Sequence, residues 1–306
     1  MTNTTLDTLL RKTAWTWYKH THQTCLIEWF TRRTKRQIVR FYTKHPPQEA
    51  RAREAIEYLR EHPLHSIPYP FIEKYIHQEI DVYRDTETGL PYVMHEGKKL
   101  FFKRSHTDEH VRTQYRQLLM EQDTLSPHRY TDSAFYVDKG DTLFDIGCAE
   151  GNFSLSAVET AAHIVLFEGE PEWVEALRAT FAPWKEKVTI VPKWVSDVDD
   201  EQSVSMDCFL RDYPGITPFI KIDVEGDESR VLKGINRLLT GNQPAKIALC
   251  TYHKPDDYAT FSSLLADKGF SITPTEGVLV FTYDHQPPYV RKALIRAVKQ
   301  SKTLTS

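Results

Sequence analysis

Several features that would point to a special compartment or partner are missing from this chain of 306 residues. The four cysteines lie far apart and form no C-x-x-C pair, so the sequence predicts neither a zinc site nor a disulfide framework, and a reducing cytoplasm is the expected location. No apolar stretch reaches the length of a membrane span, and the first residues show no apolar signal-peptide segment. The formal net charge of −3 gives no general attraction to nucleic acid, so no nucleic-acid partner is expected.

The part of the chain before residue 135 reads as an accessory region of helices and a β-hairpin. Residues 5–44 and 46–63 have helical patterns, and the second begins at Pro-Pro and ends at His-Pro. Residues 79–104 are rich in β-branched and aromatic residues around turns at Gly89 and Gly97, which predicts a hairpin or small meander. A helix should follow from about residue 108, with Ser105 or Thr107 as its N-cap.

Residues 135–306 alternate between strands and helices. Apolar strand patterns cover residues 142–147, 163–168, 188–196, 219–226, 246–253, 270–275 and 277–284, and helical patterns separate most of them. The last segment, RKALIRAVKQSK, reads as a basic terminal helix. This alternation predicts an α/β fold with a doubly wound, mostly parallel sheet, whose ligand lies at the carboxyl ends of the strands.

The first of these strands ends in the sequence DIGCAEG, residues 145–151. A dinucleotide site needs G-x-G-x-x-G, and counting from Gly147 the other required positions hold Ala149 and Asn152, so that fingerprint is broken. The acids Asp145 and Glu150 would repel a pyrophosphate. A cationic ligand without phosphate, such as S-adenosylmethionine, suits them better, and Glu168, at the end of the next strand, is placed to accept both ribose hydroxyls.

These motifs, with Phe167-Glu168, Val195-Ser196-Asp197 and the string IKIDVEGDE from Ile220 to Glu228, resemble the FkbM-type family of class I S-adenosylmethionine-dependent methyltransferases. The resemblance covers roughly residues 135 to 285 and implies a Rossmann-like sheet of seven strands with the last one antiparallel. It implies that Asp145, Gly147 and Gly151, with the adjacent Asn152, hold the methionine end of the cofactor. Glu168 would then bind the ribose, and Ser196 and Asp197 the edge of the adenine.

Two residues are the candidates for catalysis. His253 ends a strand on the same rim and titrates in the range that a general base needs, and Asp223 ends the neighbouring strand. Both have ordinary structural interpretations, as a solvated histidine at a strand end and an acid near a helix start. A metal held by Asp223, Glu225 and His253 is geometrically conceivable, but the spacing matches no tight ligand motif, so no metal is predicted.

The acceptor is less well defined by the sequence. Base methylation typically uses an Asn/Asp-Pro-Pro-aromatic turn after the fourth strand, where this chain has Asp223-Val-Glu-Gly. The family resemblance implies O-methylation, and a saccharide, glycan or other small-molecule hydroxyl is the favoured acceptor. The basic aromatic stretches near both ends leave peripheral membrane contact or a homo-oligomer open, although helices packed on the catalytic part are favoured. An NAD-type oxidoreductase and a non-catalytic cofactor-binding module remain the alternatives.

Overall fold

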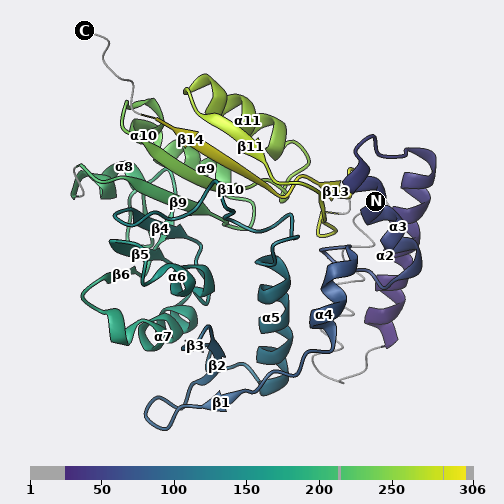
Figure 1. Cartoon of the computed structure of the whole chain (residues 1–306), viewed down its shortest axis with the longest axis horizontal. Coiled ribbons are helices and arrows are strands. Elements are labelled where there is room, and N and C mark those ends of the chain that lie inside the picture. Colours follow the sequence, from purple (N-terminus) through teal and green to yellow (C-terminus); the bar gives the residue numbers. More distant parts are fainter. Residues whose placement is uncertain (1–24, 213–214, 285, 301–306) are drawn as a thin grey trace.

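The computed structural model describes residues 25–212, 215–284 and 286–300 (Figure 1). Within them, the central sheet has seven strands: β4 (Thr142–Ile146), β5 (His163–Phe167), β6 (Val188–Val191), β9 (Pro218–Ile222), β10 (Ala245–Cys250), β11 (Ser271–Pro274) and β14 (Leu294–Lys299). Their spatial order is β11-β14-β10-β9-β4-β5-β6. The pairs from β10 through β9, β4 and β5 to β6 are parallel, and β14 is antiparallel to both β10 and β11. The predicted α/β sheet of seven mostly parallel strands is therefore confirmed.

The last strand of this sheet lies in a different place from the one that the sequence suggested. Residues 277–284 contribute only the short β12 (Leu279–Val280), which pairs with β13 (Val290–Arg291) outside the central sheet. The predicted basic terminal helix is wrong, because residues 294–299 form β14 in the interior of the sheet. Its side chains Leu294, Ile295 and Ala297 are all buried between β10 and β11, which outweighs the helix-forming preference of its Ala, Leu and Lys residues.

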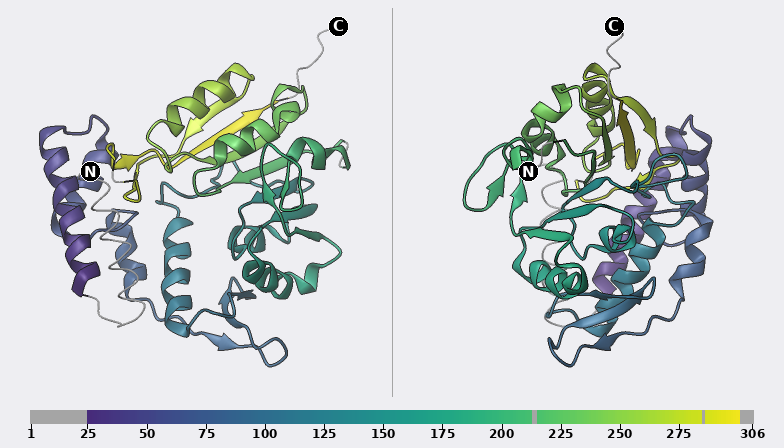
Figure 2. Two further views of the ribbon diagram at one scale, coloured as in Figure 1. Left: turned by 180° about the vertical axis from the view of Figure 1, so that it is seen from behind. Right: turned by 60° about the vertical axis from the view of Figure 1, so that its left-hand side comes forward.

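Side chains alternate strictly between the two faces of the sheet, as the twofold repeat of a strand requires. Phe144, Ile220 and Ile247 belong to the apolar cluster that packs on α8 (Met206–Phe209), α9 (Glu228–Gly234), α10 (Asn236–Thr240) and α11 (Asp257–Asp267). Leu143 and Phe219 face the opposite cluster, which includes side chains of α6 (Asn152–Ala157) and α7 (Pro171–Thr180). The sheet is thus covered by helices on both faces (Figures 1 and 2).

The accessory region packs on the second of these faces. It contains α2 (Cys25–Lys44), α3 (Ala50–Glu61), η1 (Pro70–Ile72), α4 (Glu73–Ile76) and α5 (Asp108–Glu121), together with the three-stranded meander β1 (Tyr83–Arg84), β2 (Pro91–His95) and β3 (Lys98–Phe101). The meander is confirmed, and Thr107 caps α5 by accepting a hydrogen bond from the His110 amide. Part of the basic aromatic stretch near the start of the chain lies outside the described residues, namely Trp15, Trp17, Tyr18, His20 and His22.

The accessory region is tied to the β12–β13 pair by hydrogen bonds between distant parts of the chain, at Val278 just before β12 and at Val290 in β13. The Val290 amide donates to the Tyr42 hydroxyl (3.0 Å), and the Val278 amide donates to the Tyr69 hydroxyl (2.9 Å). Figure 1 shows α2 and α3 beside β13 at one end of the molecule. The predicted boundary between residues 134 and 135 stays a prediction, although one apolar cluster joins side chains from both sides of it.

No helix in the described ranges combines the length and the apolar character that crossing a membrane requires.

Candidate functional site

A cavity of about 520 Å³ lies at the carboxyl ends of β4, β5 and β9. This is the edge at which open α/β sheets bind their ligands, and the volume is in the range of small-molecule sites. Its wall combines the turn after β4, the ends of β5 and β9, the loop after β10 and one side of α5. The lining side chains used below are Gln114, Glu121, His128, Tyr130, Asp145, Glu150, Asn152, Glu168, Trp194, Lys221, Asp223, Glu225, Asp227 and Tyr252.

The turn after β4 can only be made with glycine at its first position. Gly147 has φ +71°, and a Cβ added there would lie 2.1 Å from the backbone oxygen of Asp223. Gly151, which precedes α6, has φ +78°, and its Cβ would lie 2.8 Å from Leu177. The two glycines predicted from the sequence therefore let the turn pass close to β9 on one side and α7 on the other.

Asp145 points into the cavity region from the buried end of β4. Its carboxylate lies 3.1 Å from the Lys221 ammonium and accepts a hydrogen bond from the Ser154 hydroxyl (2.7 Å). The same ammonium donates to the Gly147 carbonyl at 2.6 Å. Burial would lower the pKa of Lys221, but Asp145 and Asp223 outweigh it and raise that pKa. The pair Asp145 and Lys221 thus fixes the turn, and Asn152 lines the cavity beside it.

Glu168 lies where the sequence predicted, at the end of β5 and on the cavity wall. One of its oxygens accepts from the Ala149 amide (3.1 Å) and the other from the Glu170 amide (2.8 Å). Burial raises the pKa of this carboxyl. Each carboxylate oxygen can accept more than one hydrogen bond, so Glu168 retains capacity to accept from a ligand hydroxyl.

Ser196 and Asp197 do not line this cavity. Asp197 accepts hydrogen bonds from Arg230 (3.0 Å) and from the Ser196 hydroxyl (3.1 Å), on the neighbouring loop surface. The preceding Val195 and the half-exposed ring of Trp194 do line the cavity, and the ring packs against Gly169, where an added Cβ would lie 2.1 Å from it. An aromatic face for a planar base is therefore offered two residues earlier than predicted.

The carboxyl group of Glu150 is not the negative charge that the sequence suggested. Its side chain is buried, accepts a hydrogen bond from the Gln114 amide (3.1 Å), and burial raises its pKa to about 8. At pH 7 this residue is mostly neutral and repels a pyrophosphate little. Any repulsion would come instead from the carboxylates of Asp145 and Asp223, which the Lys221 ammonium partly neutralises.

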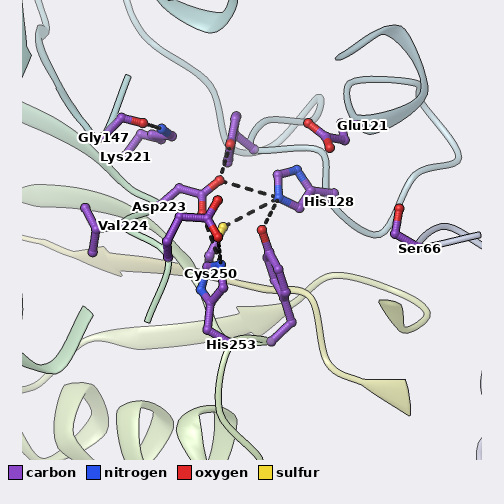
Figure 3. A network of polar contacts seen from close by, with 12 residues as sticks. Ser66, Glu121, His128, Gly147, Lys221, Asp223, Val224, Cys250 and His253 are labelled. Atoms are coloured by element: carbon purple, nitrogen blue, oxygen red, sulfur yellow. Dashed lines mark hydrogen bonds and ion pairs between the residues drawn. The ribbon is translucent and has the colours of Figure 1, made fainter. Parts of the chain in front are cut away.

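Asp223 is the centre of a polar network at the far end of the cavity (Figure 3). One oxygen accepts from the Tyr130 hydroxyl (2.8 Å) and lies 3.6 Å from Nε2 of His128, while the other lies 3.8 Å from Nε2 of His253. Burial would raise the pKa of Asp223, but His128, Lys221 and His253 outweigh it, so that pKa lies far below its usual range. A carboxylate that is protonated so reluctantly is a weak general base and a good anionic anchor.

His253 is brought next to Asp223, as the sequence predicted, but it is not among the residues that line the cavity. Its side chain is only 2% exposed, and Nδ1 lies 2.8 Å from the buried carboxylate of Glu228 on α9. Burial would lower the pKa of His253, yet Glu228 and Asp223 outweigh it and raise that pKa. His253 thus lies beside α9 and Tyr252, directly behind the residues that line the cavity.

Sequence reasoning did not single out His128, which does line the cavity. Its Nε2 lies 3.4 Å from the Tyr252 hydroxyl, and burial, which would lower its pKa, is outweighed by Glu121 and Asp223. His128 is in the irregular segment between α5 and β4, where no motif or periodicity marks it. The only available signal was the neighbouring pair His128 and Tyr130, two residues apart before the first strand.

The accessory region contributes to this site through α5 and the loop that follows it. Gln114, Glu121, His128 and Tyr130 all line the cavity and all precede residue 135. Of the residues described between 25 and 75, none is part of the wall. The first helices therefore support the site from a distance.

The strand order defines a Rossmann-like methyltransferase fold. Counted along the chain, the sheet places the third, second, first, fourth, fifth, seventh and sixth strands side by side, with the seventh reversed. The dinucleotide-binding fold has the order 3-2-1-4-5-6 and lacks that reversed insertion.

Solved structures similar to this chain include several methyltransferases. Methyltransferase FkbM from Methylobacillus flagellatus KT has 16% identity and a TM-score of 0.42, and the match covers 63% of this chain and 55% of that one. A precorrin-6y C5,15-methyltransferase from Geobacter metallireducens GS-15 has 17% identity and a TM-score of 0.37 over 54% of this chain and 82% of that one. An rRNA methylase from Streptococcus thermophilus has 10% identity and a TM-score of 0.35 over 54% of this chain and 90% of that one.

Similarities this weak assign neither a substrate nor a family, and this chain spans only about half the length of the first of these proteins. No protein-family model matches the chain, and no curated protein sequence matches it. Membership of the FkbM-type family therefore stays a prediction.

Proposed function

We propose that this protein is an S-adenosylmethionine-dependent methyltransferase that methylates a hydroxyl group of a saccharide or another small molecule. The observation that carries the proposal is the reversed strand β14 between β10 and β11, in a sheet whose ligand edge holds Asp145, Glu168 and Asp223. This edge offers carboxylates to a cationic nucleoside and lacks the second and third glycines of a pyrophosphate cradle.

In this proposal the cavity wall divides into a cofactor end and an acceptor end. The turn from Asp145 to Gly151, with Asn152, holds the amino-acid part, Glu168 accepts from the ribose hydroxyls, and Trp194 faces the base. S-adenosylmethionine, when bound, supplies the methyl group: its carbon–sulfur bond breaks with the electron pair going to sulfur, as the acceptor oxygen bonds to the methyl carbon. The protein's part is mainly to align the reacting atoms.

The acceptor end is formed by residues around Asp223. His128 lines the cavity and is the group proposed to take the proton that the acceptor hydroxyl loses. Asp223 lies between the two histidines and orients them, since its own pKa is too low for it to hold a proton near neutrality. His253, the catalytic residue expected from the sequence, is proposed to act through Asp223 because it lies behind the cavity wall.

Titration calorimetry on the full chain tests the cofactor. We expect S-adenosylmethionine to bind with one site per chain, and Glu168→Ala to weaken that binding at least tenfold. Glu175→Ala is the matched control, since Glu175 is on α7, pairs with Arg104 and is not part of the cavity wall. Tight binding of NAD with no binding of S-adenosylmethionine would overturn the proposal in favour of an oxidoreductase.

The acceptor is tested by incubating the protein with methyl-labelled S-adenosylmethionine and a fractionated cell extract. We expect label in saccharides or small molecules, in a linkage that is stable as an ether. Label in RNA or protein would refute the acceptor class, and cofactor binding without labelling of any fraction would favour a non-catalytic binding module.

A further inference from the structure

We propose that Asp223, Glu225 and His253 bind a divalent metal ion at the acceptor end of the cavity. Nε2 of His253 lies 3.8 Å from Oδ1 of Asp223 and 3.6 Å from Oε2 of Glu225, and the three candidate ligand atoms lie within 4.8 Å of one another. With metal–ligand bonds of roughly 2.0–2.2 Å, two ligands of one ion are about 3–4 Å apart. The observed spacings are therefore close to those of a coordination sphere.

These spacings are too long for hydrogen bonds, and the atoms concerned are buried. Nε2 of His253 and Oδ1 of Asp223 have no hydrogen-bond partner in the described part of the chain, and each is shielded from solvent. Leaving buried polar atoms unsatisfied costs on the order of 1–3 kcal/mol each. One ion placed between them would satisfy both atoms at once, and this is the observation that points to a ligand.

The surroundings of His253 match those of a metal-binding histidine. Its Nδ1 lies 2.8 Å from Oε1 of Glu228, a side chain that is fully buried. This contact is an ion pair and not an aligned hydrogen bond, but the negative charge of Glu228 favours a proton on Nδ1, which would leave the lone pair of Nε2 for the ion. Histidines that bind metals usually have their second nitrogen held by a carboxylate, carbonyl or water in this way.

The same carboxylate shapes the loop that carries the third ligand. Oε1 of Glu228 accepts hydrogen bonds from the backbone amides of Val224 and Gly226, each at 3.2 Å. Between them, Glu225 has φ +55°, a conformation that non-glycine residues adopt at an energetic cost. The loop is thus held in the conformation that turns Glu225 toward His253. Most of the Glu225 side chain is exposed to solvent, so an ion could reach it from there.

A second cluster, formed by His128, Asp223 and Cys250, is a weaker candidate. Oδ2 of Asp223 already accepts from the Tyr130 hydroxyl, and Nε2 of His128 lies 3.4 Å from the Tyr252 hydroxyl. Burial raises the pKa of the Cys250 thiol well above its ordinary value, which opposes the thiolate that a metal needs. These atoms have partners, whereas Nε2 of His253 and Oδ1 of Asp223 have none among the described residues.

One imidazole and two carboxylates form a mixed ligand set that suits a first-row divalent ion such as Mn²⁺. The role of the ion rests on the proposed function: bound beside the acceptor, it would hold the hydroxyl oxygen and lower its pKa, so that His128 can remove the proton more easily. The binding of the ion itself does not require methyl transfer, and the two can be tested separately.

The test is Mn²⁺ binding to the full chain, freed of metal with a chelator and measured by electron paramagnetic resonance and calorimetry without any nucleoside. We expect one Mn²⁺ per chain, and at least a tenfold loss of affinity in Glu225→Gln. Asp256→Asn is the matched control, because it removes one negative charge from the exposed part of the loop that carries His253, at a residue outside both the cavity wall and the cluster. It should bind Mn²⁺ as the wild type does.

Glu228→Gln tests the positioning of His253, and its fold is checked by circular dichroism. We expect weaker Mn²⁺ binding with an altered resonance spectrum. Absence of Mn²⁺ binding by the wild type, or equal losses in Glu225→Gln and Asp256→Asn, would overturn the metal site. Binding of S-adenosylmethionine with no Mn²⁺ binding would leave the proposed function standing and remove the metal, and the reverse result would keep the metal and remove the function.

Discussion

Gly147 is the residue at which the geometry of the site is most restrictive. Replacing it with alanine would place a Cβ 2.1 Å from the Asp223 backbone oxygen, at a φ of +71°. We expect Gly147→Ala to cost several kcal/mol of unfolding free energy or to push the turn away from β9, and in either case to abolish binding of S-adenosylmethionine. Urea unfolding and calorimetry measure the two effects.

Gly97 provides the control for backbone strain alone. It has φ +79° in the turn between β2 and β3, and apart from its two chain neighbours no described residue comes within 4 Å of the position its Cβ would take. Gly97→Ala should cost only about 1 kcal/mol and leave cofactor binding intact. Equal losses in the two variants would show that the close approach of the turn to Asp223 has no part in the site.

Glu150 should make the folding stability depend on pH. Its pKa is raised from 4.5 to about 8 in the folded chain, so the folded state holds the proton more tightly than the unfolded state does. Stability is therefore lost as the pH rises from about 4.5 to about 8. The loss is at most a few kcal/mol, since a tenfold change in proton affinity between the two states corresponds to about 1.4 kcal/mol.

Glu150→Gln removes this titration while keeping the shape of the side chain. Urea titrations at pH 5 and pH 8.5 give the unfolding free energy of both proteins. We expect the free energy of the variant minus that of the wild type to be larger at pH 8.5 than at pH 5. A difference that stays constant across this range would refute a raised pKa at Glu150.

Residues of the cofactor turn could be predicted from the sequence because they are close together in it. Asp145, Gly147 and Gly151 follow one strand directly, and Glu168 follows the next, so strand order alone brings them to one edge. His128 and Tyr130 reach Asp223 across more than ninety positions, from an irregular segment without a periodic pattern. Such contacts depend on how α5 packs on the sheet, which no local motif encodes.

At the scale of elements, β14 and the adjacent β13 position two walls of the cavity through arginines. Arg291 is buried and donates to the carbonyls of Tyr252 (3.1 Å) and His253 (2.8 Å). Arg296 donates to the carbonyls of Arg129 (2.8 Å) and Tyr130 (3.2 Å). The described part of the segment that the sequence suggested as a basic terminal helix is thus largely buried, and Arg291, Arg296 and Lys299 in it have internal partners.

Exchanging each arginine for lysine tests these roles, because lysine cannot reproduce several donors in a fixed plane. Both Arg291→Lys and Arg296→Lys should lower the unfolding free energy by about 1–3 kcal/mol. Only Arg291→Lys should also weaken Mn²⁺ binding strongly, since it releases the backbone of His253. Equal Mn²⁺ affinity in the two variants would show that Arg291 does not position that histidine.

The elements themselves were largely predictable up to β11, and the reason for the later failure is physical. Residues 142–147 and 163–168 are apolar on both faces, so they could only be buried strands. Residues 294–299 carry Arg296 and Lys299 among apolar residues, a spacing that also suits a helix. Only the tertiary partners of these cations, such as the Leu239 carbonyl 2.7 Å from the Lys299 ammonium, make the strand possible.

At the scale of the whole molecule, the face of the sheet that carries the site depends on the accessory region. One apolar cluster contains Ile38 and Leu59 of the first helices, Val111 of α5, and Leu143 and Phe219 of the sheet. Removing residues 1–134 would expose that face to water, at a cost of roughly 25 cal/mol for each Å² of apolar surface uncovered. The cavity would lose the wall made by α5 in the same step.

We therefore expect the full chain to unfold in a single urea transition, with tryptophan fluorescence and circular dichroism giving the same midpoint. A chain restricted to residues 135–306 should show no cooperative transition and no binding of S-adenosylmethionine. A 135–306 chain that folds cooperatively and binds the cofactor would instead support the predicted boundary at residue 135 as the edge of an autonomous domain.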